Sequence, residues 1–167
     1  MDKISSISIV HTSTRDYKET LDRCKKAILK KNIAINHIVA NKSIKDLKKL
    51  DSSNDLVLVI GGDGTMIGAI RELCHLNIPF LGVNIGELGF LTDLQLGSLD
   101  IELPKILEGQ YQEESRNLLE ISNSKKSFLA VNEVVMHSGE LAKMTSFSLF
   151  KNNNLVANHK SDGLIVS

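Results

Sequence analysis

An unbroken apolar run that ends in a cluster of glycines constrains the fold of this chain more than any other feature. Residues 55–65 read DLVLVIGGDGT. A run of Leu, Val and Ile without polar alternation predicts a strand buried on both faces, as in a parallel sheet flanked by helices. We expect this strand to end at Gly61 and an amphipathic helix, capped by Thr65, to follow. In such a sheet, ligands bind where the strands end.

The glycine cluster predicts a site for a phosphate group. Glycine has no Cβ, so the backbone N–H groups of Gly61, Gly62 and Gly64 can approach an anion closely, and the positive end of the following helix points to the same place. Asp63 would repel phosphate and therefore needs another role, such as accepting a proton or holding a metal bound to phosphates. The alternative interpretation is a tight strand-to-helix turn whose bend the aspartate stabilises.

Four blocks in this order resemble the NAD kinases. They are GGDGT at 61–65, GVNIGELGFLT at 82–92, VNEVV at 131–135 and SDGLIVS at 161–167. The first block alone is shared with lipid kinases of the diacylglycerol type and, more distantly, with phosphofructokinases. The other three blocks favour NAD kinase, and the resemblance extends from about residue 55 to residue 167.

The resemblance implies that the γ-phosphoryl group of ATP is transferred to the 2'-hydroxyl of the adenosine ribose of NAD, giving NADP. Asp63 matches the family residue proposed to accept the hydroxyl proton. Phe90 and Leu91 match residues that wall the dinucleotide pocket, and Asn132 with Glu133 matches an NAD-binding pair. The expected NAD- and ATP-binding residues are Gly61, Gly62, Gly64, Thr65, Ile67, Asn84, Phe90, Asn132, Glu133, Lys143, Lys160 and Asp162.

Each assignment has a structural alternative. The Asn84 block could be a loop that needs positive φ, the Asn132–Glu133 pair could be a strand end or bulge, and both lysines could be solvated surface residues. We expect the pair to be buried, because it interrupts an apolar strand, and to need ligand contacts for that reason.

Apolar periodicity predicts the remaining elements. Before the glycine cluster we expect a strand at 7–10, a helix at 16–30, an edge strand at 33–39 and a short helix capped by Ser43. A strand at 78–83 follows, and then a helix within 98–108 whose regular part begins near Pro104. Segments 118–122, 128–137, 145–151 and 155–159 are strand-like and predict antiparallel structure. The expected domains are a Rossmann-like α/β domain at 1–97 and the start of an all-β domain at 98–167.

The family continues after SDGLIVS into a TPTGSTAY stretch and about a hundred further residues, so the sequence predicts the N-terminal portion of a larger enzyme. An apolar strand at the end of the chain would also need partners for its edge. The rival interpretations are a diacylglycerol-type lipid kinase and a nucleotide-binding fragment without catalysis.

Composition excludes several partners. Lys plus Arg equals Asp plus Glu at 20 each, so no global field recruits nucleic acid or an anionic membrane. No apolar run approaches the roughly twenty residues that span a bilayer, and the two cysteines lack a metal pattern. We expect a cytoplasmic protein without a protein-bound metal. Mg²⁺ or another divalent cation would arrive with ATP. The resemblance further implies a homo-oligomer, a tetramer or dimer.

Overall fold

The computed structural model describes residues 4–13, 17–86, 89–139 and 143–167. The chain forms two compact units, residues 1–115 and 116–167. The division lies after residue 115 rather than after residue 97, because helix α4 (Leu99–Leu107) buries Leu99, Leu103 and Leu107 in the core of the first unit.

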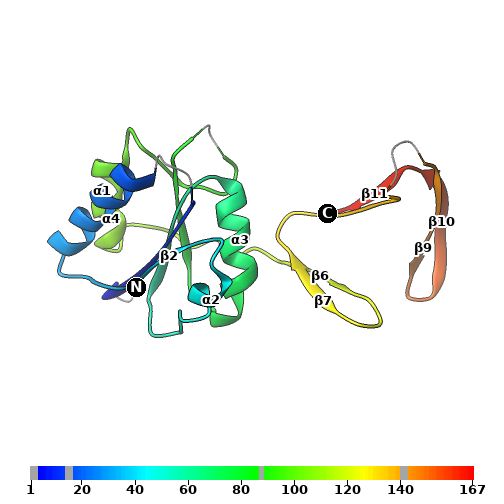
Figure 1. Ribbon diagram of the computed structural model, residues 1–167, viewed down its shortest axis with the longest axis horizontal. Helices are drawn as coiled ribbons and strands as arrows, with labels where there is room; N and C mark the ends of the chain where they lie inside the picture. Colours follow the sequence, from blue (N-terminus) through cyan, green and yellow to red (C-terminus); the bar gives the residue numbers. More distant parts are fainter. Residues whose placement is uncertain (1–3, 14–16, 87–88, 140–142) are drawn as a thin grey trace. The chain divides into compact units, whose positions relative to one another are not determined.

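The first unit is a five-stranded parallel sheet with helices on both faces (Figure 1). The strands are β1 (Ser6–His11), β2 (Ala34–Ala40), β3 (Leu56–Ile60), β4 (Phe80–Asn84) and β5 (Leu94–Gln95), in the order β2-β1-β3-β4-β5. The other helices are α1 (Tyr17–Lys30), α2 (Ile44–Leu47) and α3 (Asp63–Leu73), and a short 3-10 turn, η1 (Cys74–Leu76), follows α3. The parallel α/β architecture expected from the sequence is confirmed.

Strand β3 is buried on both faces, as its unbroken apolar run predicts. Leu56, Leu58 and Ile60 pack in one hydrophobic cluster with α1 and α4. Val57 and Val59 pack in a second cluster with α2 and α3, which lie on the opposite side of the sheet (Figure 1). Because side chains alternate along a strand, one five-residue strand anchors both helical layers.

The carboxyl ends of the strands lie at one level. His11 of β1 is in register with Ile60 of β3, Ile60 with Val83 of β4, and Val83 with Leu94 of β5. The chain runs from β1 outward to β2 on one side and from β3 outward to β4 and β5 on the other. The order therefore reverses between β1 and β3, which is where open α/β sheets bind ligands.

Most element positions match the sequence expectations, including β2 at the sheet edge. The first residue of the expected helix at 16–30 lies outside the described residues, and α1 is described from Tyr17. Ser43 does precede α2, but its hydroxyl donates to the Asp46 carboxylate at 2.5 Å instead of accepting a backbone N–H.

The expectation that α4 begins near Pro104 was wrong. The helix begins at Leu99 and keeps Pro104 in its interior, although proline removes the N–H that would bond to the carbonyl of Asp100. The leucines at 99, 103 and 107 form one buried stripe, each at most 3% exposed. Burial of three leucines, at about 1.5–3 kcal/mol each, outweighs the local cost of the proline.

The second unit consists of antiparallel strand pairs, as expected. They are β6 (Leu119–Ser122) with β7 (Ser127–Ala130), β8 (Val134–His137) with β11 (Gly163–Val166), and β9 (Thr145–Lys151) with β10 (Asn154–Ser161). The segment 128–137, expected as one strand, is divided between β7 and β8. All the buried hydrophobic residues identified among the described residues belong to the first unit.

Candidate active site

The turn between β3 and α3 forms the centre of the candidate site. β3 ends at Ile60, Gly62 is extended, and α3 begins at Asp63. Thr65 is therefore not the helix cap that the sequence suggested. It lies within the first turn of α3 and is buried.

Gly61 has a role in the fold. Its N–H donates to the carbonyl of Val83 at 2.9 Å, so this group extends the sheet and cannot also cradle a phosphate as we expected. A Cβ at Gly61 would lie 2.4 Å from Oγ1 of Thr65. The packing of Thr65 against the turn thus accounts for this glycine.

No contact among the described residues explains why residues 62 and 64 are glycines. A Cβ at either position would meet no described atom within 4 Å. In the described part of the chain, the N–H groups of Asp63 and Gly64 donate to no backbone acceptor, as is usual in a first helical turn. The amino end of α3 therefore offers unpaired donors, the positive end of a helix dipole and open space, which together fit an anion.

The Asp63 carboxylate is held by a distant segment of the chain. Its Oδ2 accepts the N–H of Phe90 at 2.9 Å, and its Oδ1 accepts the N–H of Leu91 at 3.0 Å. An ionised carboxylate has about four acceptor positions, so each oxygen can still accept a further hydrogen bond. The side chain is thus fixed in orientation and keeps capacity for a hydroxyl group.

Residues 89–93, which we call the clasp, contact this turn closely. A Cβ at Gly89 would lie 2.2 Å from Oδ1 of Asp63, and one at Gly82 of β4 would lie 2.7 Å from Cα of Thr92. Gly89 therefore permits the close contact between the clasp and Asp63, and Gly82 permits the close contact between β4 and the clasp. Phe90 itself is 93% exposed in the first unit.

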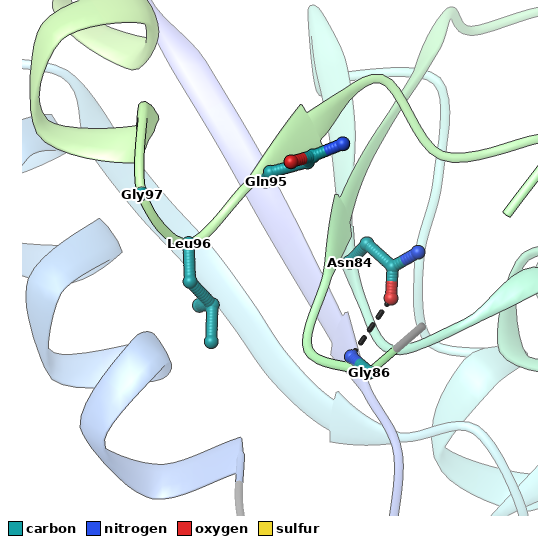
Figure 2. A pocket seen from close by; sticks show the side chains of 5 residues that line it. All are labelled: Asn84, Gly86, Gln95, Leu96 and Gly97. Carbon is teal, nitrogen blue, oxygen red and sulfur yellow. Dashed lines mark hydrogen bonds between the residues drawn. The ribbon is translucent and has the colours of Figure 1, made fainter. Parts of the chain in front are cut away.

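Asn84, at the end of β4, lines a cavity of about 240 Å³ together with Gly86, Gln95, Leu96 and Gly97 (Figure 2). Asn84 is buried, and its Oδ1 accepts the N–H of Gly86 at 2.8 Å. That bond shapes the start of the loop after β4, which supports a structural role for Asn84 in addition to any ligand contact.

Two further residues near these features were not expected from the sequence. His11 ends β1 beside the point where the strand order reverses, and its ring stacks on Tyr17 with centroids 4.1 Å apart. Its Nδ1 lies 2.7 Å from the carbonyl of Thr12 and must carry the proton, since a carbonyl only accepts. Arg23 of α1 donates to the carbonyl of Leu96 at 2.9 Å and so fixes one wall of the cavity. The position of His11 at the end of the first strand was a usable signal.

The other expected residues lie in α3 and in the second unit. Ile67 is half-buried in α3. Asn132 and Glu133 lie between β7 and β8 and are both exposed, so the expectation of a buried pair was wrong for this unit, whose hairpins enclose no buried hydrophobic core among the described residues. Lys143 and Lys160 are exposed, and Asp162 lies between β10 and β11, where its carbonyl accepts the N–H of Ser138.

Neither a metal-binding group of side chains nor a membrane-spanning helix occurs among the described residues. Within the ranges given above, no three His, Cys, Asp or Glu side chains group closely enough to hold a metal ion. No helix in the described part of the chain is long and apolar enough to cross a membrane.

The fold and this turn define a parallel α/β protein with unpaired N–H groups at the start of α3 and an oriented carboxylate at the carboxyl edge of its sheet. Comparison with known proteins gives the family, since residues 7–111 match the ATP-NAD kinase N-terminal domain. The chain belongs to the NAD kinase family.

Individual relatives agree with this assignment. An NAD kinase from Azotobacter vinelandii (strain DJ / ATCC BAA-1303) is 39% identical over 170 residues, which cover 99% of this chain and 58% of that protein. An NAD kinase from Pseudoalteromonas translucida (strain TAC 125) is 45% identical over 135 residues, covering 78% of this chain and 46% of the relative. The matches thus span about half the length of these relatives.

A solved structure supports the fold. The crystal structure of yeast NADH kinase complexed with NADH matches 98% of this chain and 57% of its own, with a TM-score of 0.76 and 16% sequence identity. The match extends over both units, and it agrees with an α/β part followed by β structure.

Proposed function

We propose that this chain carries the catalytic carboxylate and the phosphate-binding turn of an enzyme that transfers the γ-phosphoryl group of ATP to the 2'-hydroxyl of the adenosine ribose of NAD. The observation that carries the proposal is the Asp63 carboxylate. It is oriented by two backbone N–H groups and stands beside Gly62 and Gly64, where the protein leaves room for a ligand.

The geometry suggests separate roles for the amino end of α3 and for Asp63. The free N–H groups at the amino end of α3 bind phosphate oxygens. Asp63 accepts the proton of the ribose 2'-hydroxyl while the oxygen of that hydroxyl attacks the γ-phosphorus of ATP and ADP departs. A carboxylate held beside an anion site repels the phosphates. A hydroxyl proton that lies between the two groups reduces this repulsion. Such a base contributes about 10² to 10⁴ in rate.

A divalent cation would enter with ATP as a magnesium complex and would offset the charge of the phosphates. Both oxygens of Asp63 already accept backbone N–H groups, and no metal-binding group of side chains occurs among the described residues. This arrangement suits a cation held largely by phosphate oxygens and water.

The second unit contributes dinucleotide contacts in this proposal. Asn132, Glu133 and Asp162 lie at the ends of strands and are exposed, so their side chains are accessible to a ligand. Lys143 and Lys160 supply positive charge for phosphate groups. A cytoplasmic location and a homo-oligomeric assembly, a tetramer or dimer, belong to the same proposal, with NAD and ATP as the small-molecule partners and neither nucleic acid nor a membrane as a partner.

The experiment is NADP formation by the 167-residue chain and by its Asp63→Asn variant, with NAD and ATP binding measured by calorimetry. An asparagine keeps the size of the side chain but is a poor base, so turnover should fall by about 10² to 10⁴ while NAD binding changes little. Asp100→Asn is the control, because Asp100 is an exposed aspartate paired with Arg23 on α1. Near-normal turnover of Asp63→Asn would remove Asp63 from this role.

Two other outcomes separate the alternatives. Binding of NAD or ATP without any NADP would favour a nucleotide-binding module. Phosphorylation of diacylglycerol but not NAD would favour a lipid kinase.

A further inference from the structure

The connection between β4 and β5 is unusual for a parallel pair. Parallel strands are normally joined by a crossover of a dozen or more residues that contains a helix. Here residues 85–93 make the connection, and its described part contains no helix. A connection without a helix needs other interactions to hold it in place. Among the described residues, hydrogen bonds to the carboxylates of Asp63 and Asp93 supply them.

Asp93 ends the ladder between the two strands. Its backbone N–H donates to the carbonyl of Gly82 at 3.0 Å, one residue out of step with the β4–β5 register, in which Gly82 lies opposite Asp93. In a regular parallel ladder with this register, the N–H of Gly82 would donate to the carbonyl of Thr92. It donates instead to Oδ2 of Asp93, also at 3.0 Å.

This replacement releases the carbonyl of Thr92 from the ladder. Because the Asp93 carboxylate supplies the acceptor, the preceding peptide groups can turn toward α3, where the N–H groups of Phe90 and Leu91 donate to Asp63. Thr92 then packs directly on Gly82, where only a glycine leaves room.

We propose that Asp93 is a positioning residue for the Asp63 carboxylate, acting by holding the clasp out of the sheet ladder so that its N–H groups face that carboxylate. The inference rests on the proposed function only for its effect on turnover. The link from Asp93 to the amides of Phe90 and Leu91 is a property of the structure.

The test compares Asp93→Ala with Asp55→Ala. Asp55 is a matched control, because its side chain also accepts backbone N–H groups, those of Ser5 and Ser6, but at the amino end of β3 and away from the clasp. Amide hydrogen exchange of Phe90 and Leu91 is measured in each variant. Asp93→Ala should accelerate exchange at both amides by about tenfold or more relative to Asp55→Ala.

Turnover gives the second readout. Asp93→Ala should lower kcat by roughly 10- to 100-fold, as expected for a misplaced catalytic group, with the KM for NAD within about threefold of wild type. Asp93→Asn keeps an oxygen acceptor for the Gly82 N–H and should recover most of the loss. In an Asp63→Asn background, Asp93→Ala should change kcat by less than about threefold, because the group that it positions is already gone.

Unchanged exchange at Phe90 and Leu91 in Asp93→Ala overturns the proposal, as do losses in kcat that simply multiply in the double variant. If the wild-type chain forms no NADP, the proposed function fails, while the exchange measurement still decides the role of Asp93.

Discussion

Replacing Gly89 by alanine tests whether the contact between the clasp and Asp63 is as close as the structure indicates. The new methyl group would lie 2.2 Å from Oδ1 and 2.9 Å from Cγ of Asp63. The two groups must separate by at least about 1 Å to reach an ordinary van der Waals distance. Because both carboxylate oxygens accept N–H groups of the next two residues, such a shift breaks at least one of these bonds.

The expected magnitude follows from that broken bond. A hydrogen bond to a charged group contributes about 1.5–3 kcal/mol, which for a unit of this size corresponds to a fall in Tm of roughly 5–10 °C. Misplacement of the carboxylate by about 1 Å should also lower kcat by about 100-fold. Thermal unfolding followed by circular dichroism measures the first effect, and NADP formation measures the second.

Gly64→Ala is the matched control, because a methyl group there meets no described atom within 4 Å. Alanine favours the helix over glycine by up to about 1 kcal/mol, so this variant should be as stable as wild type or more stable. Its nucleotide binding should nevertheless weaken, because the methyl group occupies the space proposed for phosphate. A Gly89→Ala chain with the Tm of wild type would refute the close contact.

Three further predictions concern stability and reactivity. Hydrogen bonds, led by that of the Ser5 hydroxyl, hold the pKa of Asp55 below its ordinary value, so its stabilisation is present at neutral pH and is lost progressively as the pH falls below about 4. Asp55→Ala should therefore lower the free energy of unfolding by about 1 kcal/mol at pH 7 and by progressively less as the pH falls below about 4, measured by urea denaturation. Burial raises the pKa of the Cys24 thiol to about 12, so iodoacetamide at pH 8 should label the less buried Cys74 first and Cys24 only on unfolding, as mass spectrometry would report. Pro104→Ala restores a helical N–H within α4 and should raise the free energy of unfolding by about 1 kcal/mol or more, seen as a higher midpoint in urea denaturation. An unchanged or lower midpoint would contradict this account of α4.

The parts of the fold that follow from local sequence were predicted well. The apolar run of β3 is buried on both faces, and the change from alternating helices and strands to strands alone marks the second unit. These features depend on side-chain periodicity within single elements, which the sequence displays directly.

The start of α3 and the course of α4 show where local rules fail. Thr65 has the chemistry of a cap, yet the cap of α3 is Gly62, three residues earlier, and the helix starts at Asp63. Pro104 has the chemistry of a helix start, yet the buried leucine stripe carries the helix across it. For α4, packing of the leucine stripe in the core outweighs the local effect of the proline, and that core includes strands far away in the sequence.

The clasp could not be predicted, because its contacts join residues about thirty positions apart. Nothing in the local sequence indicates that the N–H groups of Phe90 and Leu91 donate to Asp63, or that Asp93 replaces a backbone carbonyl in the ladder. The motif GELGFLT has no helical or strand periodicity, so only its resemblance to a family block marked it as functional.

The glycines of this region separate into two groups by the atoms that a Cβ would meet. Gly61, Gly82 and Gly89 face side chain or backbone at 2.2–2.7 Å, so the folded chain itself requires them. Gly62 and Gly64 face nothing within 4 Å, so no described atom of the protein requires them. Glycine within a helix costs about 0.5–1 kcal/mol relative to alanine, so Gly64, which lies inside α3, carries a cost that no contact of the described chain explains. The amino end of α3, where unpaired N–H groups meet that open space, is the place where a phosphate group would require a glycine.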